Sequence, residues 1–253
     1  MNADAKRQVN IEPDEYAANE LAAELFGTIV CQAVADSGQC SVALAGGTTP
    51  HALYQLLASQ APMSGLPWDR LEVFWGDERD VPHDHVESNY GMAQRTLLDH
   101  VPVPPTQIHP MPADAQDIQS AAAEYEQVIR RVVPAGPDGT PQFDLILLGV
   151  GGDGHTASLF PDTPAVDETE KLVMGQHVSV LGRSRMTFTF PLINAARNVL
   201  FQITGEDKAE VVADLLSEQR RGVSKLPAAR VQPAGKLYVV LDRDAARKAE
   251  AGE

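Results

Sequence analysis

The chain has 253 residues, of which 43% are hydrophobic and 22% are charged, a composition typical of a globular chain with a substantial core. Its formal net charge of −15 argues against nucleic acid or a membrane surface as a partner, because both are bound through clustered Lys and Arg. The only cysteines, Cys31 and Cys40, form no CxxC pair, and residues 1–15 lack the apolar stretch of a secretory signal, so we expect a cytoplasmic protein.

The apolar pattern of the N-terminal half predicts alternating helices and strands. The first helix is expected over residues 13–35, with an apolar face formed by Leu21, Leu25, Ile29 and Val34. Further helices are expected around Leu53, Leu56 and Leu57, over 89–98 and over 120–133. The expected strands are 41–45 (SVALA), 71–75 (LEVFW) and 143–148 (FDLILL).

The C-terminal half continues this alternation. Strands are expected to begin at Leu172 and to cover 186–190, 199–204 and 237–241, with a helix over 208–217. The 186–190 segment (MTFTF) alternates as a half-exposed strand does. Together these elements indicate an α/β fold with a mainly parallel sheet flanked by helices on both faces. Ligands of such sheets bind beyond the carboxyl ends of the strands, so the loops after strands are where chemistry is expected.

The first such loop is GGTTP, which follows the 41–45 strand. Thr49 suits the N-cap of a helix and Pro50 suits its first position. Two glycines permit close approach of a ligand, and the helix N-terminus offers unpaired N–H groups, which together suit an anion such as phosphate. A tight turn with a capped helix explains the same residues, and the loop alone favours neither interpretation.

The second loop is GDER, at residues 76–79 after the 71–75 strand. Taken alone, its charges are most simply explained by a solvated turn with an internal ion pair. The functional interpretation gives Arg79 the task of holding an anion or a polarised carbonyl oxygen.

The third loop, residues 149–161, follows the 143–148 strand and contains GxGxxG. No long amphipathic helix follows it, and no second strand ends in an acid about 20 residues later, so it does not indicate a dinucleotide site. His155 is expected to begin a short helix, whose N-terminus would keep the imidazole neutral, and Asp153 is expected to orient the ring. A neutral imidazole can take a proton from water, although most lone histidines are structural.

The segment 83–87 (HDHVE) has residue types that bind metals. It is polar and loop-like, and no partner ligands can be placed, so no metal site is expected. Neither HExxH nor GxSxG occurs in the chain.

In this order, ALAGGTTP, FWGDERDVP…ESNYG and LLGVGGDGHTASLFP resemble the 6-phosphogluconolactonase family. The resemblance continues through RMTFTFPLINAARNVLFQITGEDKAEVV to LPAARVQP, and so covers about residues 40 to 233. Related glucosamine-6-phosphate deaminases have Asn-Glu-Pro after the histidine, where this chain has Ser158-Leu159-Phe160-Pro161.

The resemblance implies a modified Rossmann-like fold in a single domain spanning 1–253, with no nucleotide cofactor. It implies hydrolysis of 6-phospho-D-glucono-1,5-lactone, the second step of the oxidative pentose phosphate pathway, with a histidine base at His155. A lactone is already electrophilic, so this chemistry needs no metal.

The sequence suggests which groups would bind such a substrate. The phosphate is expected on Gly46, Gly47, Thr48 and Thr49, with cationic help from Arg185 and Lys208. Arg185 fits the family's Arg-x-Thr register best, but Arg183 remains an alternative. Arg79 and backbone N–H groups would stabilise the oxyanion. We expect a monomer, because no exposed apolar stripe is evident.

Two other functions compete with this one. A sugar-phosphate isomerase or deaminase of the same superfamily would need a carboxylate base near C2 of the sugar, and Asp77 and Asp153 are candidates. A non-catalytic sugar-phosphate sensor would carry a DNA-binding segment, which the acidic N-terminal helix does not resemble.

Overall fold

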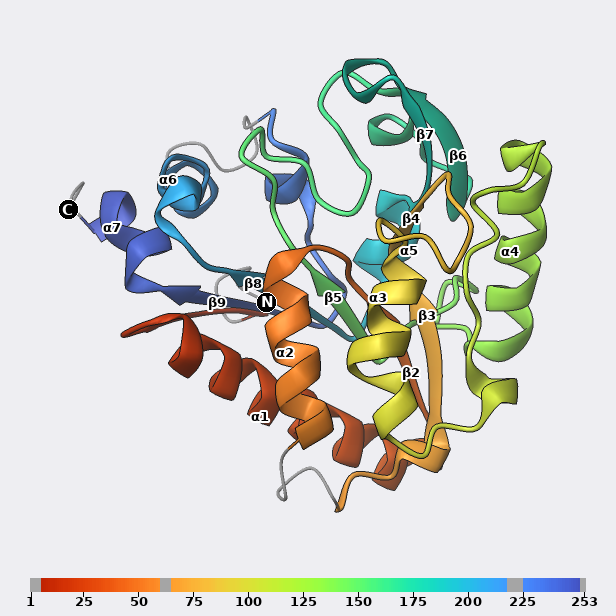
Figure 1. The fold of residues 1–253 in the computed structure, drawn as a ribbon, viewed down its shortest axis with the longest axis horizontal. Coiled ribbons are helices and arrows are strands. Elements are labelled where there is room, and N and C mark those ends of the chain that lie inside the picture. The colour runs from red at the N-terminus through yellow and green to blue at the C-terminus, as the bar shows by residue number, and fades with distance from the viewer. Residues whose placement is uncertain (1–5, 60–64, 218–224, 251–253) are drawn as a thin grey trace.

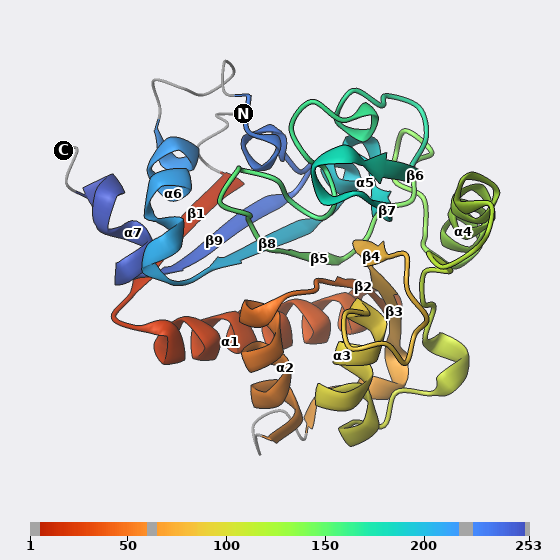
Figure 2. The same ribbon diagram turned by 45° about the horizontal axis from the view of Figure 1, so that its top comes forward.

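The computed structural model describes residues 6–59, 65–217 and 225–250. These form a six-stranded parallel sheet with helices on both faces, and a three-stranded antiparallel sheet beside it (Figures 1 and 2). The large sheet has the order β1 (Arg7–Glu12), β9 (Lys236–Asp242), β8 (Asn198–Ile203), β5 (Leu145–Leu148), β2 (Cys40–Leu44) and β3 (Leu71–Trp75). The small sheet has the order β4 (Asp77–Arg79), β7 (Arg183–Phe188) and β6 (Val173–Val178). The expected α/β class and mainly parallel sheet are confirmed.

The helices form two layers around the large sheet. One face carries α1 (Glu15–Ser37), α2 (Thr48–Ser59) and α3 (Asn89–Thr96), and the other carries α5 (Phe190–Ala195), α6 (Ala209–Leu216) and the small sheet (Figure 2). Two helices lie further out: α4 (Ile118–Val132) packs against β6, and α7 (Arg243–Glu250) packs against α6. No helix within the described ranges is both long and apolar enough to cross a membrane.

The first helix shows how local chemistry sets its limits. Asp14 accepts a hydrogen bond from the backbone N–H of Ala17 and so caps the helix start. Gly38 ends it in the left-handed region, with φ of 82°, and donates its N–H to Val34 O. The expected helix over 13–35 is therefore confirmed, displaced by two residues at each end.

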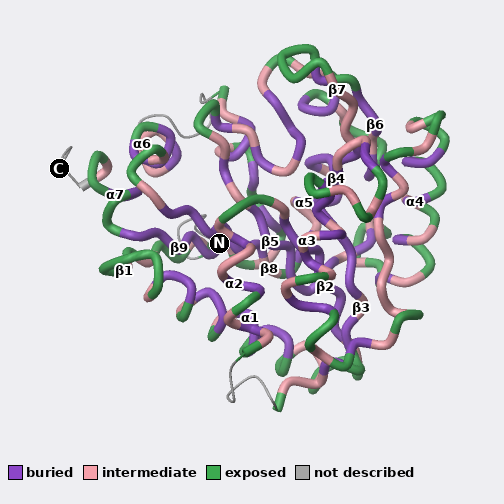
Figure 3. The backbone as a smooth tube through the Cα atoms, viewed as in Figure 1, coloured by how far each residue is buried: buried purple, intermediate pink, exposed green. Residues whose placement is uncertain are grey.

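The strands of the large sheet form the centre of the core. Every residue of β2 and β5 is buried, as the continuous apolar run in FDLILL indicated, and the buried segments gather at the middle of the molecule (Figure 3). Buried side chains of the small sheet belong to the same cluster. Phe188 of β7, for example, lies 5.4 Å from Phe143 between ring centroids.

The small sheet differs from the sequence expectation. The 186–190 segment was expected to be half exposed, but Met186, Thr187 and Phe188 are all buried, and the strand spans 183–188. The alternation is misleading because consecutive side chains of a strand point to opposite faces, and here both faces of β7 are covered. β1, β4, α5 and α7 were not expected, since each is short or mostly polar.

The strand order reverses between β2 and β5. The chain passes from β2 outward to β3 at one edge, then returns to β5 on the other side of β2. Because all strands of the large sheet are parallel, the loops after β2 and β5 both begin at the carboxyl ends of the strands, side by side. Such a reversal is where open α/β sheets bind ligands.

At the amino ends of the strands, a buried carboxylate joins β5 to β2. Asp144 Oδ2 accepts hydrogen bonds from Ser41 N at 2.8 Å and Ser41 Oγ at 3.0 Å, which ties the start of β5 to β2. Its Oδ1 lies 3.1 Å from Arg197 Nε. Ser41 and Asp144 are both buried, so water cannot readily replace the carboxylate as the partner of Ser41.

We predict that Asp144→Ala lowers the free energy of unfolding by about 1–3 kcal/mol, because a buried backbone N–H loses its partner. The measurement is the urea denaturation midpoint. The matched control is Asp138→Ala, at an exposed turn where the carboxylate accepts a hydrogen bond from Thr140 N. Equal midpoints for the two variants would contradict the prediction.

Candidate active site

A cavity of about 240 Å³ opens at the strand reversal. Its walls come from the ends of β2, β3, β5 and β8 and from the loops that follow them. Two of these segments are the glycine turn (residues 46–49) and the histidine loop (residues 149–161). The lining includes Gly46, Gly47, Thr48, Thr49, Asp77, Arg79, His155, Thr204 and Lys208.

The glycine turn enters α2 earlier than expected. Gly47 has φ of 102°, a left-handed conformation that suits glycine, and α2 begins at Thr48. The prediction that Thr49 caps the helix is therefore wrong. Thr49 lies inside the first turn, where its Oγ1 is 3.3 Å from Thr204 Oγ1. The start of α2 lines the cavity, so its unpaired N–H groups lie where an anion would bind.

Gly46 leaves no room for a side chain. A Cβ built at this position would lie 1.7 Å from Asn89 Oδ1. The Asn89 amide, from the first residue of α3, therefore packs directly against the glycine turn. This contact gives Gly46 a steric requirement that the sequence alone did not reveal.

His155 does not begin a helix, contrary to expectation. It lies in an irregular loop, with a turn on either side, so its ring is not at the N-terminus of a helix of its own. The ring instead lies against Asp153, with Nδ1 2.5 Å from Oδ1, and its centroid is 4.1 Å from that of Phe160. The expected contact between Asp153 and the ring is present.

The hydrogen bonds of this pair define the state of the imidazole. Burial raises the pKa of Asp153, but the backbone N–H of His155 and the charge of its ring outweigh burial and hold that pKa below its ordinary value. An anionic Asp153 can accept a hydrogen bond only from a protonated Nδ1, so in the neutral ring Nε2 carries the lone pair. Within the described residues Nε2 has no hydrogen-bond partner, and His155 lines the cavity.

Two cations also line the cavity. Arg79 donates one N–H to Glu87 O at 2.7 Å, which leaves other guanidinium N–H groups for a ligand. Lys208 Nζ lies 3.0 Å from Asp207 Oδ2, and its side chain is a quarter exposed. The cavity therefore has positive charge at two places despite the acidity of the whole chain.

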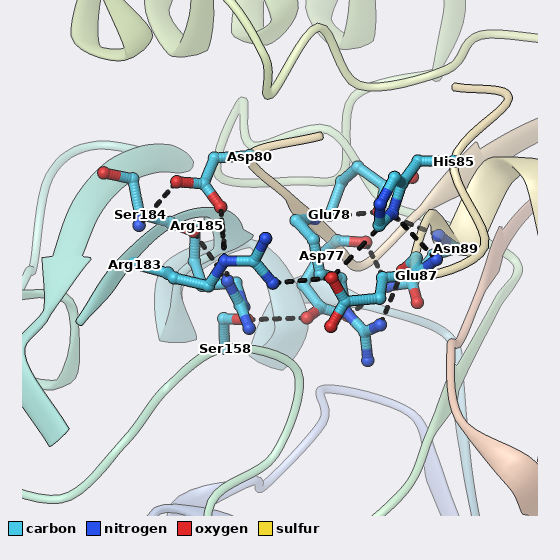
Figure 4. Close-up of polar contacts among 11 residues, drawn as sticks. Asp77, Glu78, Asp80, His85, Glu87, Asn89, Ser158, Arg183, Ser184 and Arg185 are labelled. Carbon is cyan, nitrogen blue, oxygen red and sulfur yellow. Dashed lines mark hydrogen bonds and ion pairs between the residues drawn. The ribbon is translucent and has the colours of Figure 1, made fainter. Parts of the chain in front are cut away.

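Neither of the two further arginine candidates lines this cavity. Register pairs Arg185 on β7 with Arg79 on β4, and the Arg185 guanidinium lies near Asp80 at 3.7 Å. Burial lowers the pKa of Arg185, and the nearby charge of Arg79 lowers it further. Arg183 pairs with Glu87 at 2.6 Å, nearer the surface (Figure 4).

The GDER loop is not the solvated turn that its charges suggested. Asp77 and Glu78 are buried, at 8% and 1% exposure. Glu78 accepts hydrogen bonds from the backbone N–H groups of Asn89 and Tyr90 and from Ser88 Oγ, which fixes the start of α3. Figure 4 shows Glu78 beside Asn89. Burial raises the pKa of Glu78 even though these donors act against that effect.

Sequence reasoning missed Asn89 and Ser158 as parts of the site. Both are polar and buried, at 1% exposure each, and both bind Asp77. Their positions within the ESNYG and GHTASLFP motifs were the only available signal. The HDHVE segment joins no cluster of three or more metal-binding side chains within the described residues.

Comparisons with known proteins place this geometry in a family. The profile described as Glucosamine-6-phosphate isomerases/6-phosphogluconolactonase matches residues 13–239. A 6-phosphogluconolactonase of Synechocystis is 41% identical over 238 residues, covering 94% of this chain and 96% of that protein. The human 6-phosphogluconolactonase is 39% identical, covering 88% of this chain and 89% of that protein.

Solved structures agree. The 6-phosphogluconolactonase of Trypanosoma cruzi superposes with a TM-score of 0.85 at 29% identity, covering 96% of each chain. That of Trypanosoma brucei has a TM-score of 0.82 at 27% identity, covering 96% of this chain and 98% of that one. A monomeric glucosamine-6-phosphate deaminase, at 20% identity and a TM-score of 0.79, shares the fold.

We predict that Gly151→Ala disables the site while leaving the fold intact. An added Cβ would lie 2.1 Å from His155 Nδ1 and 2.8 Å from Asp153 Oδ1, so the ring must move. We expect turnover to fall by about 10²-fold, the effect of displacing a reacting group by roughly 1 Å. The matched control is Gly152→Ala, where an added Cβ meets nothing within 4 Å. Equal losses in both variants would contradict the steric account.

Proposed function

The chain belongs to the glucosamine-6-phosphate isomerase/6-phosphogluconolactonase family, and from that premise we propose that it is a lactonase. It hydrolyses 6-phospho-D-glucono-1,5-lactone to 6-phospho-D-gluconate, with His155 as general base. One observation carries this proposal: the free Nε2 of His155 belongs to a ring that lines the same cavity as the glycine turn. A base and an anion site thus share one substrate-sized space.

The substrate's phosphate is placed on the glycine turn. Gly46, Gly47, Thr48 and Thr49 supply backbone N–H groups and hydroxyls at the start of α2, and Lys208 supplies a charge from the neighbouring wall. Holding the phosphate fixes the sugar ring, so the lactone carbonyl meets His155 without a further search. Arg185 does not line the cavity, so in this proposal it acts only through its register neighbour Arg79 and does not bind the phosphate itself.

The reaction then follows from the protonation state. Nε2 of His155 takes a proton from water as the water oxygen bonds to C1 of the lactone. Asp153 keeps Nδ1 protonated and stabilises the imidazolium that forms. Arg79 and backbone N–H groups stabilise the oxyanion. When the bond between C1 and the ring oxygen breaks, His155 returns the proton to that oxygen, which leaves the open-chain acid.

The same contacts argue against the isomerase or deaminase alternative. That chemistry needs a free carboxylate as base near C2 of the sugar. Both oxygens of Asp77 accept protein hydrogen bonds, from Asn89 and Ser158, and Asp153 Oδ1 is bound to His155. The charge of −15 also favours a small substrate over nucleic acid, and we expect the enzyme to act as a cytoplasmic monomer.

His155→Ala is predicted to reduce kcat by about 10²–10⁴-fold, the usual contribution of a general base. The assay follows 6-phosphogluconate formed from fresh lactone, with spontaneous hydrolysis subtracted. The control is His177→Ala, which changes an exposed residue of β6. Wild-type kcat in His155→Ala would remove this residue from the role. Ammonia release from glucosamine 6-phosphate by the wild type would indicate the deaminase instead.

Lys208→Ala is predicted to raise KM by about tenfold with little change in kcat, because a phosphate contact is made equally in the ground and transition states. Lys236→Ala at the start of β9, on the opposite edge of the parallel sheet, is the matched control and should leave both constants unchanged. A fall in kcat at constant KM would instead place Lys208 in the chemical step.

A further inference from the structure

A carboxylate that the proposed mechanism does not use lies between its two working segments. Asp77 begins β4, directly beyond the carboxyl end of β3, and is 8% exposed. Its Oδ2 accepts a hydrogen bond from Ser158 Oγ at 2.6 Å, and its Oδ1 accepts one from Asn89 Nδ2 at 3.2 Å. Figure 4 shows Asp77 with Ser158 on one side and Asn89 on the other.

Ser158 anchors the histidine loop. Besides its bond to Asp77, its backbone N–H donates to Thr187 Oγ1 at 3.1 Å, and its carbonyl accepts from Gln176 Nε2 at 2.7 Å. Thr187 and Gln176 belong to the middle and outer strands of the small sheet, and both are buried. All three polar groups of Ser158 are therefore held by groups outside its own loop.

The short segment between His155 and Ser158 needs this anchor. Ala157 has φ of 47°, in the left-handed region that non-glycine residues adopt at a cost of roughly 1–2 kcal/mol. Leu159 N donates to Thr156 O at 2.9 Å and closes a turn around this residue. A strained turn persists only where its ends are fixed, and here the fixed end is Ser158.

The other side of Asp77 reaches the glycine turn. The Asn89 amide donates to Asp77 O at 2.9 Å as well as to its carboxylate. Those bonds aim Asn89 Oδ1 at Gly46, where a Cβ would lie 1.7 Å away. Glu78 holds the Asn89 backbone through its N–H at 2.8 Å, so the amide has little freedom to turn.

We propose that Asp77 is a positioning residue that sets the distance between the general base and the phosphate-binding turn. Its two carboxylate oxygens form two arms, one through Ser158 to the histidine loop and one through Asn89 to Gly46. This inference rests on the proposed function, because it assigns the two arms to the two ends of the same substrate.

A carboxylate suits this position because both neighbours donate hydrogen bonds to it. The Asn89 amide turns its NH₂ group toward Asp77 and so can only donate to it, and the Ser158 hydroxyl also donates a hydrogen bond. A carboxylate accepts from both, whereas an amide presents one acceptor and one donor. The two arms should affect different constants. The Ser158 arm should affect kcat, because His155 acts only in the chemical step, and the Asn89 arm should affect binding, because the glycine turn holds the phosphate.

The test compares Ser158→Ala with Asn89→Ala. We expect Ser158→Ala to lower kcat by about 10²-fold through displacement of His155, with the Kd of inorganic phosphate unchanged. Asn89→Ala should weaken inorganic phosphate binding by about tenfold, with kcat little altered. Asp77→Ala, if it folds, should show both losses. The reverse pattern, or equal loss of both quantities in each single variant, overturns the proposal.

Stability and function are separated by two controls. Asp144→Ala removes a buried, hydrogen-bonded carboxylate at the amino ends of the strands, away from the cavity. It should lower the stability of the protein as Asp77→Ala does, while leaving kcat and phosphate binding unchanged. The imidazole NMR resonances of His155, assigned from their loss in His155→Gln, should shift or broaden in Ser158→Ala and not in Asn89→Ala. Unchanged resonances in Ser158→Ala contradict the positioning role.

This design distinguishes failure of the inference from failure of the proposed function. Wild-type hydrolysis of the lactone tests the function. The phosphate Kd and the His155 resonances need no turnover, so they decide the role of Asp77 even if the lactone proves to be the wrong substrate.

Discussion

The shared direction of the six strands of the large sheet is the constraint on which the site depends. Because the strands are parallel, their carboxyl ends meet at one edge, and the reversal between β2 and β5 leaves two of the following loops as neighbours. The glycine turn and the histidine loop are about a hundred residues apart in sequence, yet they line one cavity. An antiparallel pairing of β2 with β5 would send these loops to opposite edges.

The small sheet gives this edge its rigidity. Its first strand, β4, follows β3 after a single glycine and pairs with β7, which comes about a hundred residues later in the chain. Its buried polar side chains bind the histidine loop, whereas a purely apolar sheet could only pack against it. Buried polar groups that are fully hydrogen-bonded specify one arrangement, because each alternative leaves a group unpaired. A strained, irregular loop can therefore hold the His155 ring in one place without being part of a helix.

The chain as a whole is acidic, yet cations in the cavity can attract an anionic ligand. Coulomb interactions between exposed charges fade within about 10 Å at ordinary ionic strength, so the many surface carboxylates act weakly on a cavity that has its own cations. Arg79 and Lys208 lie on its walls, and the start of α2 adds oriented N–H groups. Asp153 beside His155 and Asp77 on the cavity wall both accept hydrogen bonds from protein donors, and Asp207 pairs with Lys208.

The α/β class, the strands SVALA, LEVFW and FDLILL, and the three loops that follow them could be predicted from the amino-acid sequence alone, because apolar periodicity and glycine placement are local properties. The sequence also indicated His155 with Asp153, two residues apart in a turn. Three facts emerged only from the folded chain: Asp77 and Glu78 are buried, Arg185 pairs with Arg79 in register without lining the cavity, and Asn89 and Ser158 flank one carboxylate. Those facts depend on strand register and on contacts between distant segments, which no local pattern encodes.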